Sequence, residues 1–177
     1  MIGTWTGNSA GNTSVAEREA AAPTGRYHRL AGKYLTFALG QEEYGLPVLK
    51  VREIIKMMDV TAVPQAPRHV KGVVNLRGKV IPVIDLRLKF DFDPQAYTDR
   101  TSIIVVEVAL QTRKVLMGIV VDAVCDVLNI AGDDIEDTPD FGHRVNTDYM
   151  TAIAKVKGTV KILLDLDRVL GADGVAA

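Results

Sequence analysis

The sequence predicts an all-β fold of two small, closed sheets packed together, and three observations support this prediction. Short runs rich in valine, isoleucine and aromatic residues recur along the chain, separated by glycine and proline. Long stretches with helical periodicity are absent from the sequence, which argues against alternating strands and helices. The third observation is an internal repeat, because two copies of one small unit would build two similar sheets.

The repeat consists of two pairs of segments in the same order. Residues 73–90 align with residues 152–170 at a shift of 80, and residues 43–55 align with residues 115–128 at a shift of 73. A glycine coincides in each alignment. Chance similarity between valine-rich hairpins is the alternative, but two segment pairs in the same order favour duplication. Each copy holds about five short strands, enough to curl into a sheet without exposed edges.

The first half of the chain supplies strands from residue 33 onward. Residues 33–40 alternate in character and are rich in β-forming residues, and a turn follows them. The segment 46–57 continues with further apolar positions. Residues 70–86 indicate two strands around a turn at residues 77–79, where Gly78 suits a positive φ.

The second half repeats this pattern. Residues 101–110 and 115–128 are two more strong candidate strands, and residues 150–166 form another predicted pair around a turn at residues 157–159. A short helical turn follows each hairpin and is opened by an aspartate cap, Asp85 in the first and Asp165 in the second.

Two terminal segments lack these patterns. Residues 1–32 are rich in Gly, Ala, Ser, Thr and Asn, so they bury too little to offset the entropy of ordering them. We expect a flexible N-terminal tail there, with a short helix near residues 15–22, and a frayed C-terminal tail at residues 171–177.

Composition excludes several classes of protein. The 177 residues are 47% hydrophobic and 24% charged, which is ordinary for a globular chain. The net charge of -1 gives no general attraction to nucleic acid or to an anionic membrane. A single cysteine permits no intrachain disulfide, and no apolar run approaches the ~18 residues of a membrane helix. We therefore expect a soluble, intracellular protein without a secretory signal.

The sequence carries no enzyme or metal signature. The segment 72–79 approaches a phosphate-binding loop, but it has one spacer residue too many, and Val80 stands where a magnesium-binding Ser or Thr is required. His28, His69 and His143 lack metal-ligand spacing. We therefore predict no catalytic residue, no cofactor and no metal.

Two further features have ordinary structural interpretations. The acidic cluster at residues 133–137 lacks the alternating ligands of a calcium loop, so it is interpreted as a solvated turn. Cys125 lies in a β-like run, where we expect a small buried core residue.

Two charged residues are candidates for contact with a partner. Arg77 would project from a rigid hairpin turn toward carboxylates or carbonyls of a partner, and Glu53 is an acid inside an apolar stretch. The alternatives are a solvated turn arginine and an outward residue on a half-buried element.

A resemblance to a known family covers roughly residues 33–170. Residues 69–87 contain Asn-Leu-Arg-Gly followed by Pro-Val-Ile-Asp-Leu-Arg and closely resemble the signature of the CheW chemotaxis coupling family. Residues 44–55 and 118–128 are similar to two further stretches of that family.

The resemblance implies two SH3-like five-stranded barrels, approximately residues 33–95 and 96–170, with an exchange of strands between them left open. It implies a cytoplasmic, non-enzymatic adaptor that binds the cytoplasmic tip of methyl-accepting chemotaxis receptors and the regulatory domain of the histidine kinase CheA. Such an adaptor binds no nucleic acid and reaches membranes only through the receptors. Carried over by motif, the receptor-binding positions are Val51, Glu53, Gly72, Asn75, Arg77, Val121, Val124 and Val127.

Three alternatives stay open at this point. The domain could belong to a larger kinase or hybrid adaptor, although neither ATP-binding motifs nor a phospho-acceptor domain is visible in the sequence. An enzyme with a site at a barrel mouth would need convergent titratable groups in a cleft. Within the family, a regulatory module could act with a chemosensory kinase system that does not drive motility.

Overall fold

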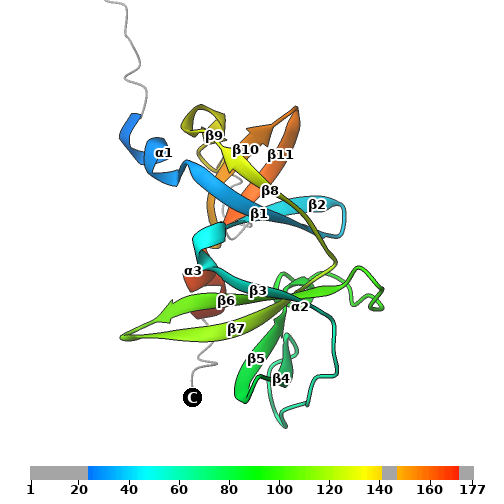
Figure 1. Cartoon of the computed structure of the whole chain (residues 1–177). Helices are drawn as coiled ribbons and strands as arrows, with labels where there is room; N and C mark the ends of the chain where they lie inside the picture. The colour runs from blue at the N-terminus through cyan, green and yellow to red at the C-terminus, as the bar shows by residue number, and fades with distance from the viewer. Residues whose placement is uncertain (1–23, 141–146, 172–177) are drawn as a thin grey trace, which may run out of the picture.

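The computed structural model describes residues 24–140 and 147–171, which form two sheets stacked one above the other (Figure 1). Strands dominate and the helices are short, so the predicted all-β fold with two subdomains is confirmed. No described helix is long and apolar enough to cross a membrane.

Sheet A, in the upper half of Figure 1, has six strands in the order β8-β1-β2-β11-β10-β9. In chain order these strands are β1 (Gly32–Leu39), β2 (Glu42–Pro47), β8 (Ala123–Ile130), β9 (Ile135–Glu136), β10 (Met150–Val156) and β11 (Thr159–Leu164).

Sheet B, in the lower half, has five strands in the order β3-β6-β7-β5-β4. They are β3 (Val51–Lys56), β4 (Val70–Leu76), β5 (Lys79–Asp85), β6 (Ser102–Leu110) and β7 (Arg113–Val121). The helical segments are α1 (Thr24–Leu30), η1 (Val48–Lys50), α2 (Leu86–Lys89), η2 (Gly132–Asp134) and α3 (Leu166–Gly171).

The structure divides the chain differently from the expected 33–95 and 96–170. After β2 the chain leaves sheet A through η1, and β3 pairs with β6 of sheet B. After β7 the chain returns, and β8 pairs with β1 of sheet A. Sheet B is thus built from residues 51–121, whereas sheet A combines residues 32–47 with residues 123–164.

The internal repeat is visible in the topology. Replacing β8, β1, β2, β11 and β10 by β3, β6, β7, β5 and β4 converts the first five strands of sheet A into the order of sheet B, and β9 is an additional strand of sheet A. In each sheet the strand after the crossover carries a one-residue bulge, at Arg52 in β3 and at Cys125 in β8. Matching strand orders and matching bulges support duplication of one unit.

The two aligned glycines serve the same purpose in the two sheets. Gly45 and Gly118 each lie where a parallel pair of strands packs closely, β2 on β11 and β7 on β5. A Cβ atom at Gly45 would lie 2.8 Å from Leu163, and one at Gly118 would lie 2.8 Å from Ile103. Only glycine fits these positions without displacing a core side chain.

The largest hydrophobic core lies between the sheets and takes residues from both. Phe37 and Leu46 from sheet A share it with Ile104 and Ile119 from sheet B, and all four are fully buried. A smaller cluster lies within each sheet. A shared core of this kind packs the two sheets into one unit.

The predicted aspartate caps are confirmed. The Asp85 carboxylate accepts hydrogen bonds from the backbone N–H groups of Arg87 and Leu88 at the start of α2. Asp165 accepts one from Arg168 before α3. Each cap satisfies backbone donors that a helix start leaves unpaired.

The expected N-terminal tail is too long. Residues 24–30 form α1, and Tyr27 and Leu30 pack against the smaller cluster of sheet A. The Tyr34 hydroxyl also donates to the Leu30 carbonyl at 2.6 Å. Tyr27 and Leu30 are three positions apart and therefore lie on one face of the helix, which anchors α1 to sheet A. The helix expected near residues 15–22 and the tail beyond residue 171 lie outside the described residues.

The expectation that Cys125 is buried is wrong. Its side chain is exposed. Cys125 is the bulged residue of β8, and a bulge removes its extra residue from the strand pairing and redirects its side chain.

Candidate functional site

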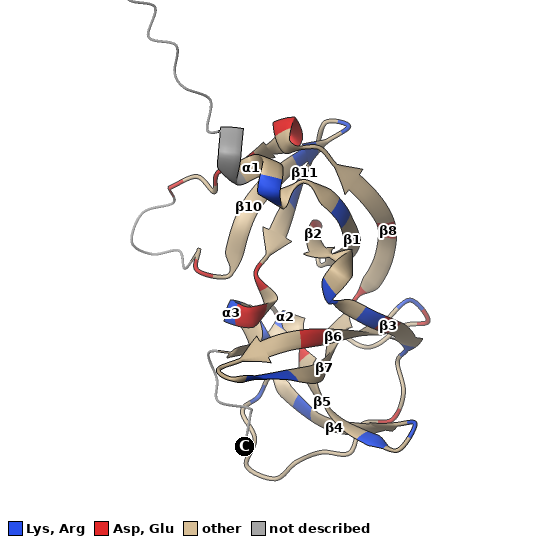
Figure 2. Cartoon of the chain, turned by 60° about the vertical axis from the view of Figure 1, so that its left-hand side comes forward, with Lys and Arg blue, Asp and Glu red and all other residues tan. Residues whose placement is uncertain are grey.

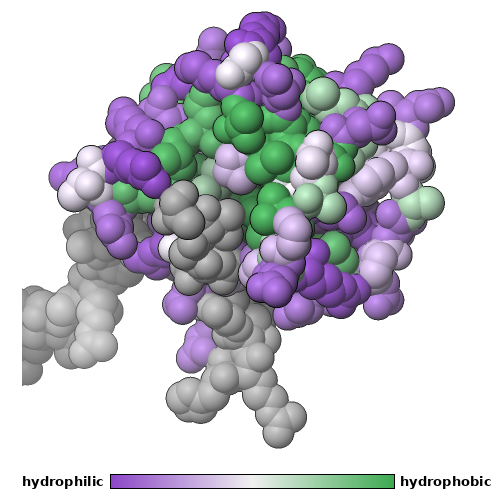
Figure 3. Space-filling view, turned by 90° about the horizontal axis from the view of Figure 1, so that it is seen from below, coloured by the Kyte–Doolittle hydropathy of each residue, from purple (hydrophilic) through white to green (hydrophobic). Residues whose placement is uncertain are grey.

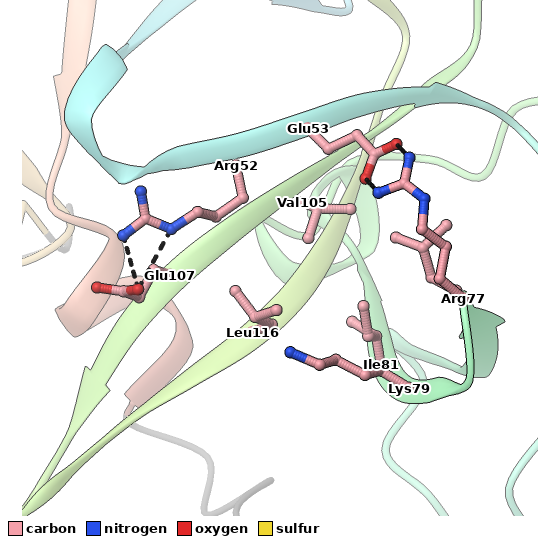
Figure 4. A pocket seen from close by; sticks show the side chains of 9 residues that line it. Arg52, Glu53, Arg77, Lys79, Ile81, Val105, Glu107 and Leu116 are labelled. Atoms are coloured by element: carbon pink, nitrogen blue, oxygen red, sulfur yellow. Dashed lines mark hydrogen bonds and ion pairs between the residues drawn. The ribbon is translucent and has the colours of Figure 1, made fainter.

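A groove of about 520 Å³ opens on sheet B, between its two edge strands (Figure 4). Edge strands β3 and β4 lie at opposite ends of the strand order, so the groove crosses the sheet. Its lining residues, here called the groove residues, are Arg52, Glu53, Leu76, Arg77, Lys79, Ile81, Val105, Glu107 and Leu116.

The floor of the groove is apolar. Ile81 and Val105 are buried, and Leu76 and Leu116 are half-buried and pack against the cluster inside sheet B. Figure 3 shows the lower face of the molecule, where apolar side chains gather within a surround of hydrophilic ones. Apolar surface that stays open to solvent gives a partner a hydrophobic contact area.

One rim is the hairpin turn between β4 and β5. Arg77 and Gly78 have φ values of 52° and 84°, the two positive values that a type I′ turn requires. The Asn75 side chain accepts a hydrogen bond from the Gly78 backbone N–H at 2.9 Å and so fixes the turn. The predicted positive φ of Gly78 is confirmed, and Arg77 also adopts this rarely populated conformation.

An ion pair spans the groove from this turn to β3 (Figure 4). Arg77 donates to both oxygens of the Glu53 carboxylate, at 2.6 and 3.0 Å. The Arg77 side chain is 77% exposed and that of Glu53 only 26%. The bidentate geometry orients the guanidinium group, while its exposed edge stays available to a partner.

The opposite rim carries a second charged group. Arg52 donates to Glu107 at 2.7 and 3.2 Å, and the Lys114 ammonium lies 3.2 Å from the same carboxylate. Hydrogen bonds from Arg52, and then from Lys114, lower the pKa of the Glu107 carboxyl. Glu107 is therefore ionised at neutral pH, and the rim keeps its mixed charge.

Of the predicted receptor-binding residues, the structure places three at the groove and the others away from it. Glu53 and Arg77 line the groove, and Asn75 holds its turn. Val51 begins β3 and packs, half-buried, against the core between the sheets. Gly72 is buried.

Gly72 has a structural reason to be glycine. Its φ is 140°, and a Cβ atom there would lie 1.9 Å from the Thr61 carbonyl oxygen. Thr61 pairs with Val73 through two backbone hydrogen bonds of 2.9 Å. Gly72 thus permits the chain after β3 to pair with β4 and offers no side chain to a partner.

The three predicted valines of β7 and β8 do not line the groove. Val121 is 1% exposed and belongs to the core between the sheets, so its side chain is closed to a partner in this conformation. Val124 is half-buried against the same core, and Val127 is 53% exposed.

Seven groove residues were missed by the sequence analysis: Arg52, Leu76, Lys79, Ile81, Val105, Glu107 and Leu116. Glu107 gave a usable signal, since it is a lone acid within a valine-rich strand. The apolar floor residues gave none, because strand alternation does not show which buried residues lie below an open edge.

Away from the groove, Tyr97 and Asp85 form a hydrogen-bonded pair of titratable groups. The Tyr97 hydroxyl donates to the Asp85 carboxylate at 3.3 Å, and burial, with a contribution from Asp85, raises the pKa of Tyr97 to about 12. Tyr97 is therefore protonated at neutral pH. In the part of the chain that the structure describes, no three His, Cys, Asp or Glu side chains are placed to hold a metal ion.

Comparison with known proteins identifies the family. The model of the CheW-like domain matches residues 33–173. The chain belongs to the CheW-like family. The resemblance predicted for residues 33–170 is thereby confirmed.

CheW-like relatives cover most of the chain. The chemotaxis protein CheW of Klebsiella aerogenes is 38% identical over 153 residues, which is 84% of this chain and 90% of the relative. That of Rhizobium meliloti is 33% identical over 135 residues, which is 76% of this chain and 84% of the relative. The crystal structure of the scaffolding protein TtCheW from Thermoanaerobacter tengcongensis has a TM-score of 0.71 and 33% identity, covering 81% of this chain and 95% of that one.

Proposed function

We propose that this chain is a cytoplasmic, non-enzymatic adaptor that couples methyl-accepting chemotaxis receptors to the histidine kinase CheA. The observation that carries the proposal is the Glu53–Arg77 ion pair, which spans an open groove with an apolar floor. Membership of the CheW-like family supports it. In the view of Figure 2, the lysine and arginine of the described residues are interspersed with aspartate and glutamate over both sheets, which does not favour nucleic acid.

The groove suits the helical tip of a receptor. A helix with an apolar stripe would bury Leu76, Ile81, Val105 and Leu116, and its polar flanks would face the two charged rims. Arg77 has unused donors for a carboxylate or for carbonyls at the turn of a helical hairpin. An orienting ion pair lowers the cost of fixing this long side chain on binding.

The kinase surface lies elsewhere in this proposal. Val80 is 68% exposed and points to the opposite face of its strand from Ile81. It offers an apolar contact on the outer flank of the hairpin, beside strand edges. The receptor tip and the regulatory domain of the kinase would then bind at the same time, as an adaptor requires.

The absence of catalysis is also part of the proposal. The carboxylates at the groove are held in ion pairs with arginine or lysine, so none serves as a free general base.

The test is a pair of titrations with the Arg77→Ala variant, one with a receptor-tip fragment and one with the kinase regulatory domain. We expect receptor affinity to fall about thirtyfold, the equivalent of ~2 kcal/mol, because an interface arginine with several donors is lost. Kinase affinity should stay unchanged. Lys157→Ala is the matched control, since Lys157 holds the same turn position in the β10–β11 hairpin with a φ of 50°.

Each other outcome has a distinct meaning. Equal weakening of both titrations would show damage to the fold. Unchanged receptor affinity would show that Arg77 is a solvated turn residue and that the groove is not the receptor site.

A further inference from the structure

Sheet A contains a counterpart of every groove residue. The strand registers define the correspondence, since Thr36 pairs with Gly45 in sheet A as Val105 pairs with Gly118 in sheet B. Across the crossover strands, Thr36 pairs with Asp126 as Val105 pairs with Glu53. A duplicated unit would therefore be expected to offer two grooves.

The floor of the counterpart is polar where the groove floor is apolar. Each floor position has the same degree of burial in the two sheets: buried positions of sheet B are also buried in sheet A, and half-buried positions are also half-buried. Leu76, Ile81, Val105 and Leu116 in sheet B correspond to Val156, Lys161, Thr36 and Glu43 in sheet A.

Two of these residues form an ion pair that is buried on the lysine side and half-buried on the glutamate side. The Lys161 ammonium contacts the Glu43 carboxylate, and the Lys161 side chain is only 9% exposed. Thr36 is also occupied, because its hydroxyl bonds to the backbone N–H and carbonyl of Asp126, both at 3.1 Å. These interactions satisfy the polar groups within the sheet.

The rim of the counterpart differs as well. Asp126 and Lys157 occupy the positions of Glu53 and Arg77. The Asp126 carboxylate accepts a hydrogen bond from the adjacent Val127 backbone N–H at 2.7 Å. Among the described ion pairs, none joins Asp126 to Lys157, so the rim of sheet A lacks a counterpart of the Arg77–Glu53 pair.

We infer that the Lys161–Glu43 pair determines specificity by excluding the partner's apolar segment from sheet A, so that each chain binds one receptor tip through sheet B. An apolar segment placed over this pair would remove the remaining water from two charges and gain little apolar contact. This inference rests on the proposed function, because it concerns the same partner segment.

Cys125, the single cysteine of the chain, can report whether a partner binds at the region of sheet A that corresponds to the groove. Cys125 is exposed and holds the bulge position that Arg52 holds at the groove. A segment bound over sheet A would cover its thiol, whereas a segment bound in the groove of sheet B would not. Alkylation of Cys125 by a maleimide therefore reports binding at sheet A alone.

The experiment adds a monomeric receptor-tip fragment to the full chain and to the variant Glu43→Leu/Lys161→Ile, which carries the residue types of sheet B. The wild-type chain should bind one fragment and show an unchanged alkylation rate. At saturating fragment the variant should bind two, the second more weakly because the rim of sheet A lacks the Arg77–Glu53 pair, and its Cys125 should be protected in proportion to occupancy of sheet A. The comparison is made with and without fragment for each protein, because both substitutions also alter the surroundings of the thiol.

A reciprocal variant tests the same inference without a gain of binding. Ile81→Lys/Leu116→Glu moves the ion pair into sheet B and should abolish fragment binding while preserving the circular dichroism spectrum. Three outcomes would each overturn the inference. The fragment could protect Cys125 in the wild-type chain, the folded sheet A variant could bind only one fragment, or the reciprocal variant could bind the fragment as well as the wild-type chain does. A wild-type chain that binds no fragment at all would instead overturn the proposed function.

Discussion

At the scale of single residues, the turn at Arg77 favours binding over stability. A non-glycine residue at positive φ costs about 1 kcal/mol, and asparagine followed by glycine is the preferred type I′ pair. The Arg77–Glu53 pair compensates little, because a largely exposed ion pair is worth about 0–1 kcal/mol. Arg77 therefore occupies a position where folding alone would favour another residue.

The variant Arg77→Asn should separate the effect of residue 77 on stability from its effect on receptor binding. We expect the free energy of unfolding to stay level or rise by up to about 1 kcal/mol, while receptor-tip affinity falls. Lys157→Asn is the control, since it relieves the same turn strain away from the groove and should leave affinity unchanged. Urea denaturation and a binding titration measure the two quantities. A loss of stability above ~1 kcal/mol for Arg77→Asn alone would assign Arg77 a structural role.

Gly72 illustrates a residue whose effect on binding would be indirect. Gly72→Ala should lower the free energy of unfolding by about 3 kcal/mol or more, because the new methyl group would collide with the Thr61 backbone and separate it from β4. Gly78→Ala is the comparison: it has a positive φ but no atom within 4 Å, so it should cost only about 1 kcal/mol. Equal costs for the two variants would show that backbone conformation, not the close contact, requires glycine at residue 72.

At the scale of elements, α1 shows how a short helix becomes part of the domain. Its two anchoring side chains and the Leu30 carbonyl all contact sheet A. The seven-residue helix is too short to be stable alone, so it depends on these contacts.

Deletion of residues 1–30 should therefore destabilise the protein by about 1–3 kcal/mol, since Tyr27 and Leu30 leave the cluster and Tyr34 loses its hydrogen-bond acceptor. Deletion of residues 1–23 is the control, because it removes none of these contacts. Thermal melts of both truncations give the comparison. Identical melting midpoints would show that α1 contributes nothing to stability.

The elements that the sequence predicted well are those with local signals. The hairpin turn at Arg77 and Gly78, the Asp85 cap and the repeat depend on neighbouring residues or on fixed shifts, and the structure contains all three. The crossovers of β3 and β8 could not be assigned to a sheet, because strand pairing over long sequence separations leaves no local pattern. Cys125 was misplaced for a related reason, since a bulge reverses the expected alternation.

At the scale of the whole molecule, two ion pairs fix the crossovers that join the sheets. Arg87 after β5 contacts Asp122 between β7 and β8 at 2.5 Å, and Asp167 in α3 contacts Lys50 in η1 at 3.3 Å. Arg87 and Asp167 correspond at the shift of 80, and their partners lie in the two corresponding crossovers, with the charges reversed. Each aspartate also accepts a backbone N–H, one from the β1–β2 turn and one from β6.

A fragment covering residues 51–121 contains all of sheet B, yet we expect it not to fold alone. Its share of the central core, including Ile104, Val106 and Ile119, would lose the side chains of sheet A that cover it. The intact chain should unfold in one cooperative transition. Circular dichroism and amide dispersion in NMR spectra would test both expectations, and a folded fragment would show that the sheets are independent domains.

The exchange of β3 and β8 has a consequence during synthesis on the ribosome. Strands β1 and β2 leave the ribosome first, but Glu43 meets Lys161 only 118 residues later. At typical elongation rates of about 5–20 residues per second, the early hairpin waits roughly 6–24 s for its sheet partners. During that interval the edge of β2 stays unpaired, and the edge of β1 stays unpaired until β8 emerges, although sheet B, itself built from consecutive residues, has already emerged beside them. A nascent chain stalled before β8 should therefore engage chaperones more strongly than the finished protein.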